Sequence, residues 1–198
     1  YTESGSYPNT NGNNLIYSQP VSSLSNHDGS IWVVSYGTNE LLQFDVNGTV
    51  VRRNKGPING FDRPMDVIRL KNGNLAVSES AGDRISILSE NGSFIKYFGA
   101  RGRGQGQLVG PQYLAEDFRG NIFVSDYGNK RIQVLNQEGE GIFSFGEKQD
   151  FFRFWWIYFG CKDRIPPISG KHTIYFLAKI RYNGENDIVC PAQRNHEV

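Results

Sequence analysis

Features that mark several protein classes are scarce in this chain of 198 residues. It has two cysteines, Cys161 and Cys190, which exclude a disulfide framework and any four-cysteine zinc site. No stretch approaches the roughly 18 apolar residues that a membrane span needs, so we predict no membrane span and no membrane among the partners. Lysine and arginine number 21 against 20 acidic residues, and this balance gives no reason to expect a surface that binds polyanions in bulk.

Glycine and aromatic residues are plentiful by comparison. The chain has 23 glycines, 13 phenylalanines, 10 tyrosines and 3 tryptophans but a single methionine, a composition that favours many short strands joined by turns. It begins at Tyr1 and not at methionine. We therefore expect it to be a piece of a longer protein.

Three copies of one pattern follow each other along the chain. Ile31–Gly37, Leu75–Glu79 and Ile122–Asp126 align without gaps, and each is followed by a second apolar run and a turn that contains glycine. The offsets are 44 and 47 residues, and repeats of that length are typical of solenoids and propellers. Each copy also has a proline before its first apolar run, at Pro20, Pro64 and Pro111.

Each copy predicts four short strands, which we call A to D. In the third copy they are Tyr113–Ala115, Ile122–Ser125, Ile132–Leu135 and Gly141–Phe145. Pairs such as Asn91-Gly92 between strands predict tight hairpins, because both residues tolerate positive φ. One four-stranded sheet cannot bury both of its faces, but sheets stacked around a common axis cover one another, which predicts a β-propeller.

The predicted fold class is all-β, an incomplete β-propeller of about three four-stranded blades plus part of a fourth. Closed propellers have about 4–8 blades, so we expect the missing blades to lie in the rest of the parent chain. The predicted domains are an irregular segment at 1–15, three blades at 16–56, 57–103 and 104–146, an irregular aromatic-rich insertion at 147–179, and a partial fourth blade at 180–198.

The aromatic run Phe151–Phe159 has no counterpart in the repeats. Three interpretations remain open: sequence foreign to the repeat, a distorted strand or plug that packs on the last blade, or an exposed patch for a partner or a membrane surface. It is too short to span a bilayer.

The repeats resemble the NHL family of propellers. The resemblance rests on Gly120–Val134 with the following Phe145-Gly146, and the terminal tripeptide Asn195-His196-Glu197 matches the one that names the family. The segment Phe98–Pro111 is similar to the linker between blades in the tripartite-motif (TRIM) NHL proteins. In that family the propeller binds single-stranded RNA or proteins, and the TRIM-NHL members carry a ubiquitin-ligase RING elsewhere in the chain.

The acidic residue that NHL repeats carry after strand B is present in two copies only. It is Asp126 in the third copy and Glu79 in the second, but Ser35 stands there in the first. We expect these side chains to accept backbone or arginine hydrogen bonds that hold the adjacent loop, and not to act as catalytic bases or metal ligands.

Antiparallel strands place the B–C loops and the D–A connections on one face of the propeller, and the A–B and C–D turns on the other. Arginine, lysine and tyrosine side chains converge on the first of these faces, where they could grip phosphates and stack on unpaired bases. The candidate binding residues are Tyr36, Arg63, Arg84, Arg101, Arg103, Tyr127, Lys130 and Arg131.

The sequence therefore predicts a cytoplasmic, non-catalytic binding module without cofactor or metal, whose partner is a protein or single-stranded RNA. The TRIM-NHL resemblance implies that it selects targets for a ubiquitin ligase. The alternative is a fragment of an extracellular NHL-like propeller that is a metal-dependent lyase or hydrolase. The three histidines are scattered, which argues against a metal site.

Overall fold

The computed structural model describes residues 18–146, 154–158, 177–182 and 185–189. Three consecutive four-stranded antiparallel sheets, here called blades one to three, account for residues 20–145. Blade one comprises β1 (Pro20–Ser25), β2 (Ile31–Ser35), β3 (Glu40–Phe44) and β4 (Val50–Asn54). Blade two comprises β5 (Pro64–Arg69), β6 (Leu75–Glu79), β7 (Arg84–Leu88) and β8 (Phe94–Phe98). Blade three comprises β9 (Pro111–Glu116), β10 (Ile122–Asp126), β11 (Arg131–Leu135) and β12 (Gly141–Phe145), with the 3₁₀ turn η1 (Tyr127–Asn129) between β10 and β11.

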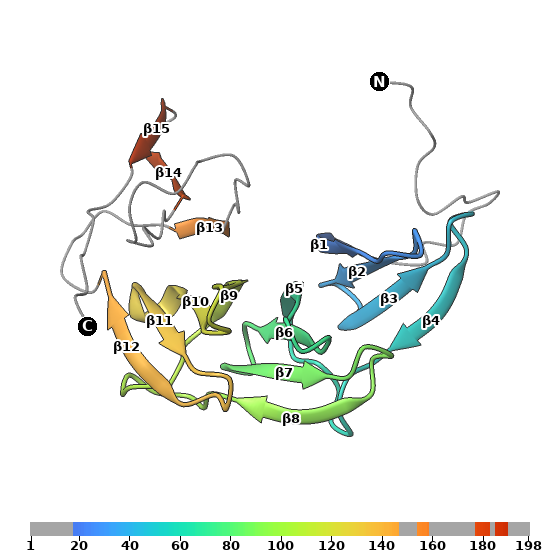
Figure 1. The fold of residues 1–198 in the computed structure, drawn as a ribbon, viewed down its shortest axis with the longest axis horizontal. Coiled ribbons are helices and arrows are strands. Elements are labelled where there is room, and N and C mark those ends of the chain that lie inside the picture. Colours follow the sequence, from blue (N-terminus) through green and yellow to red (C-terminus); the bar gives the residue numbers. More distant parts are fainter. Residues whose placement is uncertain (1–17, 147–153, 159–176, 183–184, 190–198) are drawn as a thin grey trace.

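The three blades form an open arc (Figure 1). Their first strands β1, β5 and β9 lie on the inner side of the arc and contact one another in sequence, whereas β4, β8 and β12 lie on the outer side. The described residues contain no α-helix, and the arc does not close. This arrangement confirms the predicted fold class, an incomplete β-propeller.

Two apolar clusters hold the blades together. The cluster between blades one and two includes Trp32, Leu41 and Phe61, and the cluster between blades two and three includes Ile85 and Leu108. All five side chains are at most 4% exposed. Burial of each such side chain contributes roughly 1.5–3 kcal/mol, so the packing of blade on blade stabilises sheets that could not bury their own faces.

The A–B and C–D turns share one conformation. In each, the first residue donates to the carbonyl of the fifth, and the glycine at the fourth position donates back to the first. Only the glycine of each turn has a positive φ, although both residues of an Asn-Gly pair tolerate it. The turns are three-residue loops with glycine in the left-handed region. The six glycines are Gly29, Gly48, Gly73, Gly92, Gly120 and Gly139.

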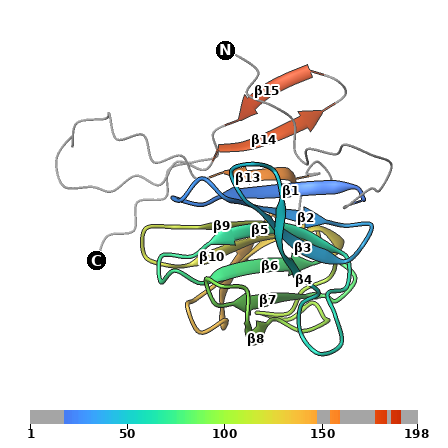
Figure 2. The ribbon, with the colours of Figure 1, turned by 90° about the vertical axis from the view of Figure 1, so that its right-hand side faces the viewer.

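The strands run across the view in Figure 2, so their connections gather at two opposite ends. We call residues 26–30, 45–49, 70–74, 89–93, 117–121 and 136–140 the turn face. The connection face comprises the B–C loops 36–39, 80–83 and 127–130 and the D–A connections 55–63 and 99–110.

A fourth sheet follows blade three. It comprises β13 (Phe154–Tyr158), β14 (Leu177–Tyr182) and β15 (Glu185–Val189), and β13 contacts β9 and β10. Strand β13 lies inside the range 147–179 that was expected to be irregular, because aromatic residues also favour strands. It agrees with the interpretation of the aromatic run as a strand that packs on the last blade. The exact domain boundaries stay a prediction.

Within the described residues, no helix has the length and apolar character needed to cross a membrane.

Candidate binding face

The acidic residue at the end of strand B anchors the connection face. In blade three, Asp126 accepts hydrogen bonds from the backbone N–H of Val109 at 2.7 Å, the amide of Asn129 at 2.7 Å and Nε of Arg131 at 2.8 Å. Its side chain is completely buried. The carboxylate therefore fixes both the B–C loop and the D–A connection, as the sequence predicted.

Blades two and one have anchors at the equivalent position. Glu79 accepts from the backbone N–H of Asp62 at 2.8 Å and from Arg84 at 2.9 Å. In blade one the hydroxyl of Ser35 accepts from the backbone N–H of Ser18 at 3.0 Å. All three N–H donors lie two residues before the proline that opens strand A, so the backbone geometry is the same although the acceptor changes.

A second set of bonds joins one blade to the next. The amide oxygen of Asn39 accepts from the backbone N–H of Arg63 at 3.0 Å, and Asp83 accepts from that of Gly110 at 2.8 Å. Asn39, Asp83 and the equivalent Lys130 all have a positive φ near 50°. Lysine has no acceptor, so Lys130 cannot make this bond to a following blade.

Two of the predicted binding residues make hydrogen bonds and ion pairs within the chain. Arg131 is 5% exposed, and besides Asp126 its guanidinium donates to the carbonyls of Arg103, Gly104 and Gln107 at 2.8–2.9 Å. Arg131 therefore holds the D–A connection in place. The expectation that it lies on the accessible binding surface is wrong, because its side chain is buried.

Arg84 is held in a similar way. It pairs with Glu79 and lies over the ring of Tyr97, with its guanidinium carbon 4.2 Å from the ring centre. Burial lowers the pKa of Arg84, but the hydrogen bond and charge of Glu79 outweigh it and keep the pKa above its ordinary value. Both guanidiniums therefore stabilise the loops through contacts within the chain. The sequence pattern that suggested a ligand contact also fits an internal ion pair.

The remaining candidates are accessible and form two groups. Arg63 is exposed and its guanidinium lies 5.9 Å from the ring centre of the half-buried Tyr36. The second group is larger. It comprises Arg101, Arg103, Tyr127 and Lys130, all exposed, and Tyr127 is 46% accessible.

Most acidic residues on this face and at the strand ends beneath it are buried, whereas the basic residues of the face are exposed. Glu79, Asp83 and Asp126 are each at most 7% exposed. Arg101 approaches the buried Asp83 at 3.7 Å but is itself 84% exposed. Among the described residues of the connection face, one exposed acid, Asp62, stands against five exposed bases: Lys55, Arg63, Arg101, Arg103 and Lys130. The accessible charge is therefore positive although the whole chain is nearly neutral.

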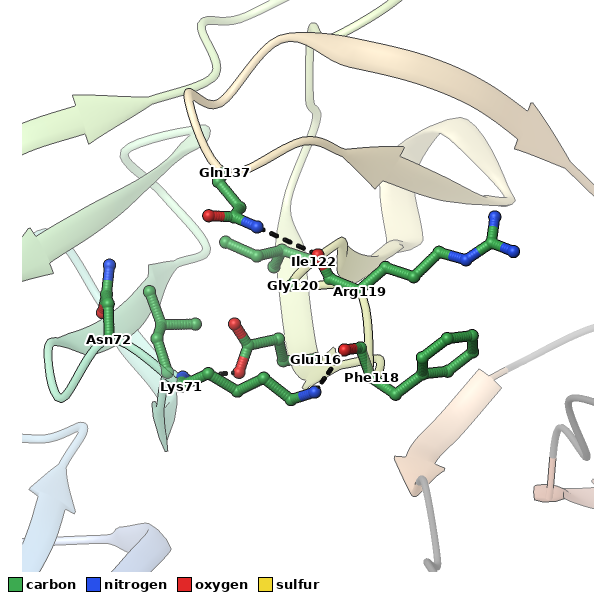
Figure 3. A pocket seen from close by; sticks show the side chains of 9 residues that line it. Lys71, Asn72, Glu116, Phe118, Arg119, Gly120, Ile122 and Gln137 are labelled. Atoms are coloured by element: carbon green, nitrogen blue, oxygen red, sulfur yellow. Dashed lines mark hydrogen bonds between the residues drawn. The ribbon is translucent and has the colours of Figure 1, made fainter. Parts of the chain in front are cut away.

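A pocket that the sequence analysis did not predict lies on the turn face, between blades two and three (Figure 3). Its volume is about 180 Å³. Leu70 and Ile122 are buried in its lining, and Glu116 and Gln137 supply polar groups. The only sequence signal was a difference between repeats, because Glu116 aligns with Arg69 of blade two.

Within the part of the chain that the structure describes, no group of three or more histidine, cysteine or acidic side chains is placed to hold a metal ion. His27 is exposed in an A–B turn, and the other two histidines lie outside the described residues.

No protein-family model matches the sequence, and no curated protein matches it. Solved structures do resemble the fold. A streptogramin B lyase aligns with a TM-score of 0.63 and 19% identity over 83% of this chain and 50% of the lyase. Virginiamycin B lyase from Staphylococcus aureus aligns with a TM-score of 0.58 and 14% identity over 81% of this chain and 49% of the lyase.

An inactive H270A form of the Staphylococcus aureus lyase with quinupristin aligns with a TM-score of 0.59 and 15% identity, over 85% of this chain and 54% of the lyase. The chain thus spans about half the length of these structures. At such low identity the likeness concerns the fold alone, and it identifies the chain as part of a β-propeller-like domain.

Proposed function

We propose that this chain is a non-catalytic binding module that takes an anionic partner on its connection face, either single-stranded RNA or an acidic segment of a protein. The observation that carries the proposal is the separation of charge on this face. Glu79, Asp83 and Asp126 are buried under the loops, and Asp62 alone among the acids of the face is exposed, while Arg63, Arg101, Arg103 and Lys130 are exposed.

The chemistry of the exposed group suits such partners. Guanidinium groups bind phosphate or carboxylate oxygens in pairs, and exposed tyrosines stack on bases or pack on peptide chains. Arg103 and Lys130 belong to backbone segments that Arg131 and Asp126 hold in place, so binding requires little further ordering of these loops.

The test uses the full chain and two fluorescent probes, a mixed-sequence RNA of 20 nucleotides and a glutamate-rich peptide, with binding followed by anisotropy. Arg101→Ala/Arg103→Ala should weaken binding of the preferred probe about tenfold or more. For RNA, the slope of log affinity against log salt should become shallower by about 0.7 for each phosphate that the variant no longer neutralises.

A matched control removes two exposed cations away from this face, Lys96→Ala/Arg119→Ala, and should leave affinity unchanged. Saturable binding to neither probe would overturn the proposal, and so would an equal loss in the control variant. Binding to only one probe would identify the class of partner.

The TRIM-NHL resemblance adds a finer proposal, in which the module selects the targets of a ubiquitin ligase. A RING domain upstream of Tyr1 in the parent chain would support it.

The alternative, a fragment of an extracellular propeller enzyme, is favoured by the lyases among the similar structures. Incubation of the chain with quinupristin and a divalent metal ion, followed by liquid chromatography and fragmentation mass spectrometry, separates the two, because a product of elimination within a ring keeps the mass of the substrate. Conversion of the antibiotic would support the enzyme, and an unchanged antibiotic would count against a lyase of this kind.

A further inference from the structure

The turn face has two equivalent sites, one at each junction between blades. At the junction of blades one and two, the side chain of Arg69 fills the site. Its guanidinium donates to the amide oxygen of Asn26 in blade one, to the carbonyl of Gly73 at 3.3 Å and to the carboxylate of Glu90 at 3.0 Å. The site is therefore built around a guanidinium group that the chain itself supplies.

At the junction of blades two and three, the same positions carry other residues. Glu116 stands at the position of Arg69, since each is the last residue of strand A and pairs with the first residue of strand B. Gln137 replaces Glu90 in the C–D turn, and Leu70 replaces Asn26 in the A–B turn. With no arginine to fill it, this junction contains the pocket of about 180 Å³.

We propose that this pocket binds the guanidinium group of an arginine side chain from a partner protein. The carboxylate of Glu116 replaces the charge that Glu90 offers to Arg69, and the carbonyl of Gly120 corresponds to that of Gly73. The ligand arginine takes the place that Arg69 occupies one junction earlier.

Two acceptor atoms in the pocket lining are unpaired among the described residues. One oxygen of Glu116 accepts from the backbone N–H of Lys71 at 2.8 Å, and the other has no donor among the described residues. Gln137 donates its amide hydrogen to the carbonyl of Arg119 at 2.9 Å, which leaves its oxygen without a donor in the same part of the chain. Guanidinium, which has five donors and no acceptor, matches such a lining.

Neither Lys71 nor Arg119 forms an ion pair with Glu116. The ammonium of Lys71 is bonded to the carbonyl of Phe118, and the guanidinium of Arg119 lies over the Phe118 ring and extends away from Glu116 (Figure 3). Burial and the charge of Asp117 raise the pKa of Glu116, and the hydrogen bond and charge of Lys71 only partly oppose them. A bound cation would relieve this penalty, while Leu70 and Ile122 offer apolar contact to the arginine methylenes.

The site is on the turn face, so its test does not depend on whether the connection face binds the partner proposed above. The test is a nuclear magnetic resonance titration of the ¹⁵N-labelled full chain with N-acetylarginine methylamide. Saturable shifts are expected at the backbone amides of Glu116, Gly120 and Gln137. N-acetylcitrulline methylamide, which has nearly the same shape without the charge, should bind about tenfold more weakly or not at all.

Three variants sharpen the result. Glu116→Gln keeps the shape and should weaken arginine binding about tenfold or more. Glu116→Arg should fill the pocket as Arg69 fills its own site, and abolish binding. Arg69→Glu/Glu90→Gln reproduces the empty site at the first junction and should raise the number of binding sites from one to two, seen as new shifts at Gly73.

Absence of saturable shifts in the wild-type chain would overturn the proposal, as would equal binding of the citrulline and arginine probes. Unchanged affinity in Glu116→Gln would also overturn it. That variant changes one partly exposed group, so circular dichroism and the melting temperature can verify that it folds even if the double variant does not.

Discussion

The first and third blades hold the same loops with different chemistry. In blade three a completely buried carboxylate, Asp126, pairs with Arg131, which is 5% exposed. In blade one the equivalent positions carry Ser35 and Glu40, and Glu40 pairs instead with Arg53 on β4, whose side chain is 46% exposed. In both blades the backbone N–H two residues before strand A donates to the side chain at the end of strand B.

One part of this arrangement is common to the blades, and another part differs between them. The fold requires an acceptor at the end of strand B, and a hydroxyl suffices. The ion pair at this position is absent from blade one but present in blades two and three, where Arg84 and Arg131 pair with buried acids. In blade three the arginine also donates to three carbonyls of the D–A connection, which need donors. The energetic consequences in the two blades should therefore differ strongly.

The largest effect is expected from Arg131→Met. The variant leaves the buried charge of Asp126 without its cation and three carbonyls without donors, so the free energy of unfolding should fall by about 3–5 kcal/mol. Urea denaturation followed by tryptophan fluorescence measures it.

The companion variant Asp126→Asn/Arg131→Met removes both charges and should recover part of the loss. A loss below about 1 kcal/mol in the single variant would mean that the pair is as weak as a surface ion pair and would remove the contrast between the blades.

The sequence predicted much of this architecture because the repeat is local. Strand positions follow from short runs of β-branched and aromatic residues between turns, and each strand of the third blade was predicted to within two residues at either end. The loop-holding role of Asp126 and Glu79 was also predicted and is confirmed.

What sequence reasoning missed depends on contacts between distant residues. Arginine looks the same in a sequence whether it points to solvent, as Arg101 does, or is buried under a loop, as Arg131 is. The pocket at Glu116 arises from the size difference between side chains at equivalent positions of two blades, so a single repeat does not reveal it. Beyond residue 146 the repeat spacing changes, and alignment no longer places the strands.

An intermediate effect is expected from Asp66→Asn at the inner side of the arc. Asp66 contacts both blades of the comparison, since it accepts from the hydroxyl of Ser22 in blade one at 2.6 Å and from the N–H of Leu114 in blade three at 2.9 Å. It also accepts from Val67. An amide in its place leaves one backbone N–H without an acceptor, so stability should fall by about 1–3 kcal/mol.

The pH dependence of this effect has a definite sign. Burial raises the pKa of Asp66 above its ordinary value of 3.8, and the hydrogen bonds from Ser22, Leu114 and Val67 only partly oppose it. In the window above pH 3.8 the folded chain keeps a proton that the unfolded chain has lost, so stability from this group falls as pH rises. The difference in melting temperature between wild type and Asp66→Asn should therefore narrow as pH increases through that window. A difference that widens would show a lowered pKa.

The smallest effect is expected from Arg53→Met in blade one. Its ion pair with Glu40 is short, at 2.8 Å, but the side chain of Arg53 is 46% exposed, so water screens the pair and replaces the missing bond. The expected loss is at most about 1 kcal/mol, measured by the same urea titration as for Arg131→Met. A loss as large as that of Arg131→Met would show that Glu40, which is 6% exposed as a residue, cannot be rehydrated without its partner. The burial of the acid, and not that of the arginine, would then set the strength of both pairs.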